Sequence, residues 1–322
     1  MFQGKRVLVT GGAGMIGREL VDLLLKEKAE VFVADLNRPN DMPKEVAFRK
    51  VDLREYQNCR TVCEGMDYVF NVVGIKASPK MCHEQPADIM VPMLMFNTNM
   101  MHAAVTSGVE WYLYTSSVGV YEPAEVLHED DVWTTQPSKN DWYGGWAKRI
   151  GELQAEAYAI QNKSKNISIV RPANVYGKYD NFDPKNAMVI PSLIRKGYEN
   201  EVLEVWGDGS PIRDFIHARD VARGMIHVVK NGITEPVNLG SGVGVPIRTI
   251  AEVIAECFGR PIKWIKDAPS GDPRRVFDMT RASSYGFRPE VPIAEGIRET
   301  VQWFLENVDL VDNRFNAFRG DK

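Results

Sequence analysis

The stretch VLVTGGAGMIGREL, residues 7–20, decides the fold, because a cluster of glycines joins a short β-branched strand to a helix. Gly11, Gly14 and Gly17 stand three residues apart within it. In such a unit the first glycine permits a tight turn, the second lets backbone approach a phosphate, and the third lets the helix pack on the strand. The helix start then faces the anion. The pattern predicts a site for a dinucleotide pyrophosphate; a helix start that merely needs glycines is the alternative.

An acidic residue ends the second predicted strand. Asp35 lies 18 residues after Gly17, where a carboxylate accepts hydrogen bonds from the adenosine ribose. It would repel the extra phosphate of NADP, which Arg38 would partly offset, so the sequence favours NAD. Asp52 ends the third strand, where it would meet the adenine unless it only caps its own loop. The expected cofactor contacts are Gly11, Gly14, Met15, Ile16, Gly17, Asp35, Asp52, Leu53, Val73 and Lys148.

Short strands alternate with helices outward from this unit. We expect strands at 5–10, 30–35, 46–52, 68–73, 111–116 and 167–171, and helices at 16–27, 87–107 and 145–161. Alternation of this kind predicts an α/β fold, a Rossmann doubly wound parallel sheet with helices on both faces. We assign residues 1–172 to this NAD-binding domain, with 214–241 returning to it. Residues 173–213 and 242–322 are expected to form a smaller α/β lobe for the substrate.

Composition narrows the class of protein. The 322 residues carry a formal net charge of −4, which disfavours a general nucleic-acid binder. No apolar run approaches the ~20 residues of a membrane span, and the first residues do not form a signal-peptide pattern. The four cysteines form no CxxC pair, so we expect neither a disulfide framework nor a metal site. A cytoplasmic protein is the expectation.

Two further stretches carry groups suited to acid–base chemistry. TSSVGVY (115–121) follows the fifth strand, and WYGGWAKRIGE (142–152) opens the next helix. A lysine charge lowers the pKa of a nearby phenol, and the phenolate can remove a hydroxyl proton as hydride leaves. Ser117 would orient the same oxygen, so Ser117, Tyr143 and Lys148 are the candidate catalytic residues.

The chain resembles the extended short-chain dehydrogenases that act on nucleotide sugars, the NAD-dependent epimerase/dehydratase family. The resemblance rests on TGGAGMIG, VADL, TSSVGVY, AKRIGE, RPANVYG, VWGDGSPIRDFIHARDVA, NLGSG and GDPRRVFD, and it spans nearly the whole chain. Residues 85–104 and 171–196 are similar to a branch of the family that handles GDP-linked keto sugars. A GDP-hexose or GDP-heptose lying between the two lobes is therefore the implied substrate.

The resemblance also implies site residues and an assembly. Sugar-nucleotide contacts would be Asn174, Val189, Arg195, Arg213 and Arg274. The forked donors of Arg213 and Arg274 suit diphosphate oxygens, although surface ion pairing is the alternative reading. Family members pair through two helices that correspond here to about 88–107 and 145–161, which implies a homodimer.

The spacing of the catalytic pair departs from the family pattern. Family members place tyrosine four residues before lysine, whereas Tyr143 and Lys148 are five apart and Gly144 holds the expected position. Five helical positions leave two side chains about 140° apart. Tyr143 would reach the site if the helix began after it, which would leave it on a flexible entry formed by Gly144 and Gly145, or if a one-residue bulge lay there.

Further departures bear on the reaction. The cysteine and histidine that perform 3,5-epimerisation in the GDP-sugar branch correspond to Gly119 and Met188, and the acidic pair of the 4,6-dehydratases corresponds to Val118 and Gly119. We therefore expect redox at carbon 4, as a 4-epimerase or 4-dehydrogenase. A GDP-4-keto-6-deoxy-sugar reductase without those epimerase residues is the alternative, and a non-catalytic protein that binds NAD and a nucleotide sugar is a third reading.

Overall fold

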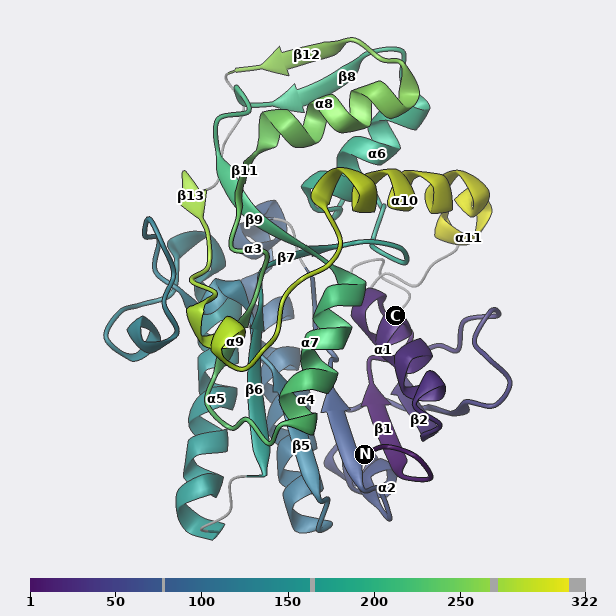
Figure 1. The fold of residues 1–322 in the computed structure, drawn as a ribbon, viewed down its shortest axis with the longest axis vertical. Coiled ribbons are helices and arrows are strands. Elements are labelled where there is room, and N and C mark those ends of the chain that lie inside the picture. Colours follow the sequence, from purple (N-terminus) through teal and green to yellow (C-terminus); the bar gives the residue numbers. More distant parts are fainter. Residues whose placement is uncertain (77–78, 163–165, 267–271, 313–322) are drawn as a thin grey trace.

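A computed structural model describes residues 1–76, 79–162, 166–266 and 272–312. Its centre is a seven-stranded parallel sheet in the order β10-β6-β5-β4-β1-β2-β3. The chain moves outward from β1 in one direction through β2 and β3, and in the other through β4, β5 and β6 (Figure 1). The strands are β1 (Arg6–Thr10), β2 (Glu30–Asp35), β3 (Ala47–Lys50), β4 (Tyr68–Asn71), β5 (Trp111–Thr115), β6 (Ile167–Pro172) and β10 (Val237–Leu239).

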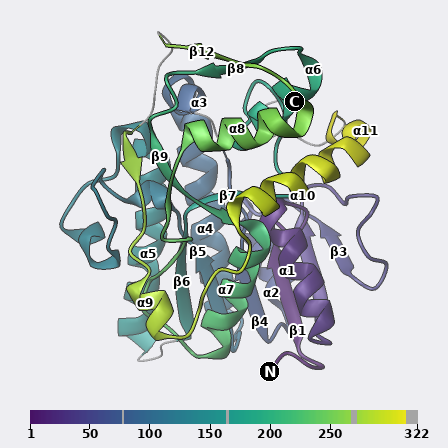
Figure 2. The same cartoon turned by 45° about the horizontal axis from the view of Figure 1, so that its top comes forward.

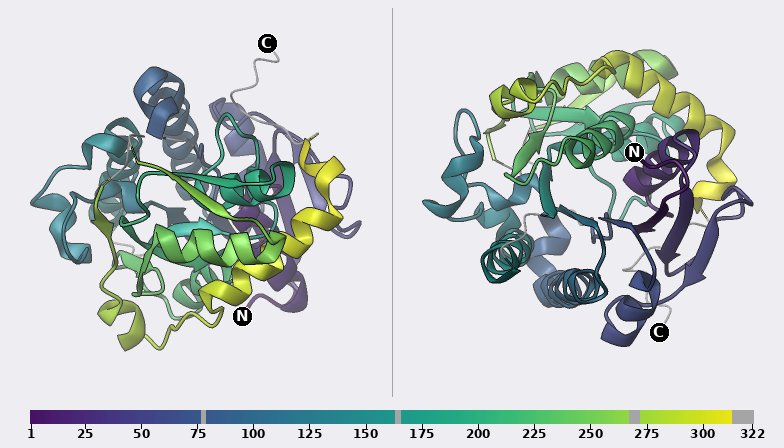
Figure 3. Two further views of the ribbon diagram at one scale, coloured as in Figure 1. Left: turned by 90° about the horizontal axis from the view of Figure 1, so that it is seen from above. Right: turned by 60° about the horizontal axis from the view of Figure 1, so that its bottom comes forward.

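Helices cover both faces of this sheet, as the view from below shows (Figure 3). On one face α1 (Met15–Lys26) packs against α7 (Ala218–Lys230) over a core that includes Val9, Leu20 and Val221. On the other face lie α2 (Tyr56–Cys63), α4 (Pro86–Thr106) and α5 (Trp142–Asn162), over a second core. The predicted doubly wound Rossmann sheet is confirmed.

A smaller α/β lobe sits above the carboxyl ends of the strands and comes forward in Figure 2. Its own core lies between α6 (Val189–Glu199), α8 (Ile247–Phe258) and α10 (Ile293–Glu306). One small sheet runs β11-β9-β13 with β7 also on β9, and another pairs β12 with β8. These strands are β7 (Asn174–Tyr176), β8 (Leu203–Trp206), β9 (Ile212–His217), β11 (Gly244–Pro246), β12 (Ile262–Ile265) and β13 (Arg274–Arg275).

The remaining elements are short. They are α3 (Pro79–Glu84), α9 (Thr280–Ser284), α11 (Val308–Asp312) and the 3-10 turns η1 (Val118–Val120), η2 (Glu129–Trp133) and η3 (Lys139–Asp141). Within the described ranges, no helix has the length and apolar character needed to cross a membrane.

The start of α5 differs from the predicted start at residue 145. The helix begins at Trp142, because η3 runs directly into it and the Ser138 hydroxyl accepts a hydrogen bond from the Asn140 amide at the start of η3. Gly145 is also fully helical. A Cβ at this position would lie 2.3 Å from the Gly119 carbonyl oxygen, so the glycine serves close packing and not a flexible entry.

Candidate functional site

The glycine loop has the geometry that a dinucleotide needs. Gly11 has a φ of +69°, and a Cβ there would lie 2.8 Å from the Val73 Cα. A Cβ on Gly17 would lie 2.2 Å from the Gly11 carbonyl oxygen, so no larger residue fits. Gly14 precedes α1, and no side chain caps its first turn, which leaves amides at the helix start for an anion. These features fit the pyrophosphate of a nicotinamide dinucleotide.

The acidic residues beside the loop differ in their surroundings. Asp35 ends β2, and its carboxylate accepts hydrogen bonds from the amides of Ala13 at 3.0 Å and Leu36 at 2.7 Å. It is therefore held directly against the glycine loop. Arg38 donates to the carbonyls of Pro43 and Val46, which turns its guanidinium into its own loop.

Asp52 lies one strand further out, in a pair with Arg54. The carboxylate and the guanidinium are 2.6 Å apart, and the hydrogen bonds from Arg54 lower the pKa of Asp52. Leu53 beside it is buried. Arg54 therefore satisfies the carboxylate locally, as the loop-capping alternative for Asp52 requires.

Ser117 and Lys148 lie on either side of one turn. Ser117 follows β5, and its hydroxyl accepts a hydrogen bond from the Gly119 amide at 3.1 Å. Lys148 on α5 is only 6% exposed, and its Nζ donates to the Thr115 carbonyl at 2.8 Å. Burial lowers the pKa of Lys148 to about 8, and the nearby Glu152 carboxylate opposes part of this effect.

Tyr143 occupies a different face of the same helix. The chain is regularly α-helical from Trp142 to Asn162, so α5 neither begins after Tyr143 nor contains a bulge. The Tyr143 side chain is 45% exposed, and no hydrogen bond joins it to Ser117 or Lys148 in the described part of the chain. Gly144, at the position expected for the tyrosine, leaves open space: the nearest atom to a Cβ there is 4.0 Å away.

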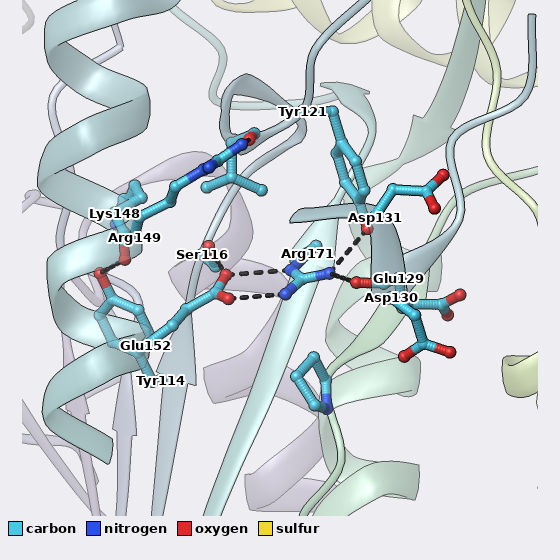
Figure 4. A network of polar contacts seen from close by, with 12 residues as sticks. Tyr114, Ser116, Tyr121, Glu129, Asp130, Asp131, Lys148, Arg149, Glu152 and Arg171 are labelled. Carbon is cyan, nitrogen blue, oxygen red and sulfur yellow. Dashed lines mark hydrogen bonds and ion pairs between the residues drawn. The ribbon is translucent and has the colours of Figure 1, made fainter. Parts of the chain in front are cut away.

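A buried polar network supports the turn that carries Ser117 (Figure 4). The Arg171 guanidinium forks onto both Glu152 oxygens at 2.9 and 2.6 Å, and the Ser116 hydroxyl donates to the same carboxylate at 2.5 Å. Arg171 also donates to the Tyr121 hydroxyl and to the Glu129 carbonyl. The network joins Arg171 on β6 and Glu152 on α5 to the segment that leaves β5, which contributes Ser116, Tyr121 and Glu129.

The predicted substrate residues lie in the smaller lobe. Asn174 on β7 donates to the Asp214 carbonyl at 2.8 Å, Val189 is the first residue of α6, and Arg195 on the same helix pairs with Glu199. Arg274 on β13 pairs with Glu125 at 3.2 Å. The two elements that carry Arg213 and Arg274, β9 and β13, are neighbouring parallel strands.

Arg213 has an unusual environment. Burial and the neighbouring Arg275 charge lower its pKa to about 10. Its Nη1 donates to the Ile212 carbonyl, and no carboxylate of the described residues lies within ion-pair distance of it. A partly buried cation without a paired anion fits a site for an anionic ligand.

Two charged residues outside the predicted set join the lobes. Arg275 on β13 pairs with Asp141 at 2.6 Å and also with Asp272. The motif GDPRRVFD contains Arg275, but only the parallel pairing of β13 with β9 shows that it lies opposite Arg213. Asp141 stands in a segment for which the sequence predicts no regular element.

The comparisons with known proteins agree with this geometry. The model of the NAD dependent epimerase/dehydratase family matches residues 7–240. The chain is 33% identical over 328 residues to "Probable GDP-L-fucose synthase 1" of Oryza sativa subsp. japonica, covering 95% of this chain and 94% of that one. It is 30% identical to a dTDP-4-dehydro-6-deoxy-D-allose reductase of Streptomyces bikiniensis, covering 94% and 97% of the two chains.

A solved structure with the same fold carries a nicotinamide cofactor. The UDP-glucose 4-epimerase of Thermus thermophilus, in complex with NAD, is 27% identical and covers 93% of this chain and 99% of that one, with a TM-score of 0.81. The resemblance to a GDP-keto-sugar branch is confirmed by the GDP-L-fucose synthases among the relatives.

Proposed function

The chain belongs to the NAD dependent epimerase/dehydratase family, and from that premise we propose that it performs nicotinamide-dependent redox at carbon 4 of a nucleotide sugar. The observation that carries the proposal is one arrangement. Ser117 follows β5, and buried Lys148 donates to the Thr115 carbonyl at the end of that strand. The neighbouring strand β4 leads to Val73, which lies against Gly11 of the glycine loop. Arg213, a partly buried cation without a carboxylate partner among the described residues, stands in the lobe above. The proposed site thus has acid–base residues, Ser117 and Lys148, in the sheet domain and a cation for the diphosphate, Arg213, in the smaller lobe.

The cofactor assignment is NAD. Gly11, Gly14 and Gly17 would admit the pyrophosphate, and the Asp35 carboxylate would bind the ribose hydroxyls and repel a 2′-phosphate. When bound, the nicotinamide accepts or returns a hydride. Lys148 would hold positive charge close to the reacting groups, and Ser117 would donate its hydroxyl hydrogen to the sugar oxygen.

We infer a GDP-hexose or GDP-heptose as substrate. Arg213 and Arg274 would bind the diphosphate through forked N–H donors, and Asn174, Val189 and Arg195 would line the remainder of the nucleotide-sugar site. The names of several relatives support GDP, whereas the Streptomyces reductase is named for a dTDP sugar. The reaction is that of a 4-epimerase or 4-dehydrogenase in our assignment.

A reductase of a GDP-4-keto sugar is the second candidate, since a relative named as a dTDP-4-dehydro-6-deoxy-D-allose reductase aligns over nearly the whole chain, as does one named as a GDP-L-fucose synthase. The two candidates differ in the direction of hydride transfer and in the preferred cofactor. The Asp35 carboxylate at the glycine loop is the observation that favours NAD and therefore the first candidate.

We further propose a homodimer in the cytoplasm. Apolar side chains on α4 and α5 remain exposed in the single chain, namely Val91, Met95, Ile150 and Leu153. Such a row on two adjacent helices fits a face that a second copy covers. All four cysteines are unpaired, which suits a reducing compartment.

The test starts from the purified chain. It is denatured, and the absorbance spectrum and mass of any released cofactor are recorded; native protein is then incubated with GDP-mannose and with GDP-heptose. NAD that becomes NADH, with inversion or oxidation at carbon 4, supports the proposal. A preference for NADPH with consumption of a 4-keto sugar selects the reductase.

Two variants identify the acid–base group in the same assay. Lys148→Met should abolish turnover. Tyr143→Phe tests the predicted phenol, and full activity in that variant would show that another group moves the hydroxyl proton. If the wild-type chain binds NAD and a GDP sugar in calorimetry yet never changes the cofactor absorbance, it is a binding protein and the redox proposal is refuted.

A further inference from the structure

A carboxyl group borders the space that Gly119 leaves open beside Ser117. A Cβ built on Gly119 would lie 3.3 Å from the Asp141 Cβ and 3.5 Å from its carboxyl carbon. The same point lies 3.5 Å from the Ser117 hydroxyl oxygen. Asp141 therefore reaches the turn that carries Ser117, although the two residues are far apart in the sequence.

Helix geometry explains why Asp141 reaches this turn and Tyr143 does not. Asp141 ends η3 immediately before α5 and stands seven residues before Lys148. Asp141 belongs to the 3-10 turn that leads into α5, whereas the five helical positions from Tyr143 to Lys148 leave those two side chains about 140° apart. The close approach of Gly145 to the Gly119 carbonyl confirms that this face packs against the turn.

A clamp fixes the Asp141 side chain. Its Oδ2 pairs with Nη1 of Arg275 at 2.6 Å, and Arg275 also binds Asp272. Asp272 is buried and accepts hydrogen bonds from the Ser138 hydroxyl at 2.8 Å and the Asn140 side-chain amide at 2.6 Å. Arg275 thus holds one Asp141 oxygen in a defined position.

The other oxygen of the carboxylate is available. Among the described residues Oδ1 of Asp141 has no hydrogen-bond partner, and the side chain is 33% exposed. The Ser117 hydroxyl accepts from the Gly119 amide, and its own hydrogen has no acceptor in that part of the chain. The Ser117 hydroxyl and the Asp141 carboxyl group therefore both border the point where a side chain at residue 119 would lie.

We propose that Asp141 is a catalytic base that removes the proton from a ring carbon next to the ketone of a bound 4-keto sugar. The inference rests on the proposed nucleotide-sugar site. Carboxylates perform this reaction on carbon acids when a neighbouring donor polarises the carbonyl. Gly119 contributes by its lack of a side chain, which leaves room for the sugar and for Asp141.

The step balances without an oxidant. The C–H bond breaks, its proton forms an O–H bond with Oδ1, and its electron pair forms the carbon–carbon double bond of an enolate. The negative charge moves to the ketone oxygen, where the Ser117 hydroxyl stabilises it. Return of the proton from Asp141 restores the ketone. Because Asp141 is partly exposed, its proton exchanges with solvent, and the ring carbon acquires solvent hydrogen.

The experiment follows this exchange with no nicotinamide added. The full chain is incubated in D2O with a GDP-4-keto-6-deoxy-hexose, and deuterium is measured by the mass of the sugar and by loss of the ring proton signal. We expect exchange well above the enzyme-free rate, and a loss of at least about 100-fold in Asp141→Asn. The Kd for GDP is measured for both proteins, and exchange is compared with the nucleotide site saturated, because Asp141 also pairs with Arg275 opposite Arg213.

Matched variants keep the test decisive. Asp130→Asn removes an exposed carboxylate that pairs with Arg281, away from Ser117, and should exchange at the wild-type rate. Asp141→Ser is measured beside Asp141→Asn in case one of them does not fold. Wild-type exchange in either folded variant overturns the proposal, as does a wild-type chain that binds the GDP sugar and catalyses no exchange. A chain that binds no nucleotide sugar refutes the proposed function and this inference with it.

Discussion

Lys148→Met should inactivate the protein and stabilise it at neutral pH. The Lys148 ammonium is buried, and its one hydrogen-bond acceptor in the described structure is the Thr115 carbonyl at 2.8 Å. Methionine has a similar length and fits an apolar site without a charge. The substitution therefore removes the free-energy cost of burying a charged ammonium group at the proposed active site.

The magnitude follows from the pKa. Burial moves the pKa of Lys148 from 10.5 to about 8, which corresponds to a cost of about 3.4 kcal/mol when the group is charged in both states. Loss of the hydrogen bond to the Thr115 carbonyl reduces the stability gained by the variant by about 1 kcal/mol. We therefore expect a net stabilisation of about 2 kcal/mol at pH 7, or about 3 °C in Tm for a chain of this length.

The pH dependence has a defined sign. Between the folded pKa of about 8 and the ordinary value of 10.5, the unfolded chain binds more protons than the folded one, so wild-type stability rises with pH in this window. Between pH 7 and about pH 9.5, the free-energy cost of burying Lys148 in the wild-type protein falls by about 2 kcal/mol, because the folded protein loses the proton. The advantage of Lys148→Met should therefore nearly disappear by the upper end of that range.

Urea unfolding at the two ends of this pH range, without added cofactor, measures both effects. Lys263→Met is the control, because Lys263 is 61% exposed and its loss should change stability by less than about 0.5 kcal/mol at either pH. A Lys148→Met protein that is less stable than wild type at neutral pH, or an advantage that stays constant with pH, would refute the reasoning. A stable, inactive variant would also show that lost activity is not lost folding.

Three further substitutions test the scaffold. Gly17→Ala should weaken NAD binding by at least about 100-fold in calorimetry, because its Cβ would lie 2.2 Å from the Gly11 carbonyl oxygen and the loop must shift; unchanged affinity would contradict the role of the loop. Arg171→Met should cost about 3–5 kcal/mol in urea unfolding, since Glu152 would remain buried without its partner, and a Glu152→Leu second change should recover most of it. Leu153→Glu should convert a dimer to a monomer in sedimentation, and a dimer that persists would place the interface elsewhere.

The sequence predicts the proposed site well where that site depends on the backbone conformation of a few consecutive residues. The spacing of Gly11, Gly14 and Gly17 predicts a turn and a close helix approach, and the structure shows both. Strand boundaries are less accurate: the predicted strand 46–52 is only Ala47–Lys50, because pairing with β2 ends at Asp35. The motif GDPRRVFD contains Arg275 but does not show its role, since its partner Asp141 comes from a distant segment and only tertiary pairing distinguishes the two adjacent arginines.

The glycine pair before Lys148 shows how local reasoning misleads at an active site. Gly144 and Gly145 suggest a loosened helix entry that would bring Tyr143 round to the lysine. The structure uses Gly145 for close packing on the Gly119 carbonyl, so the same residue that would free the helix fixes its rotation.

We expect this fixed rotation to decide which titratable group meets the sugar of the proposed substrate. Gly145 on α5 packs against the Gly119 carbonyl, the Asp141 side chain at the end of η3 approaches Gly119, and Lys148 donates to the Thr115 carbonyl, whereas Tyr143 is 45% exposed. The missing side chain at Gly119 and the displaced tyrosine look like two separate losses of function in the sequence. In three dimensions both belong to one arrangement, because a side chain at 119 would crowd Asp141 at 3.3 Å. Gly119→Ala therefore tests the arrangement from the other side: it should slow the proton exchange assigned to Asp141 while leaving the melting temperature of the chain nearly unchanged.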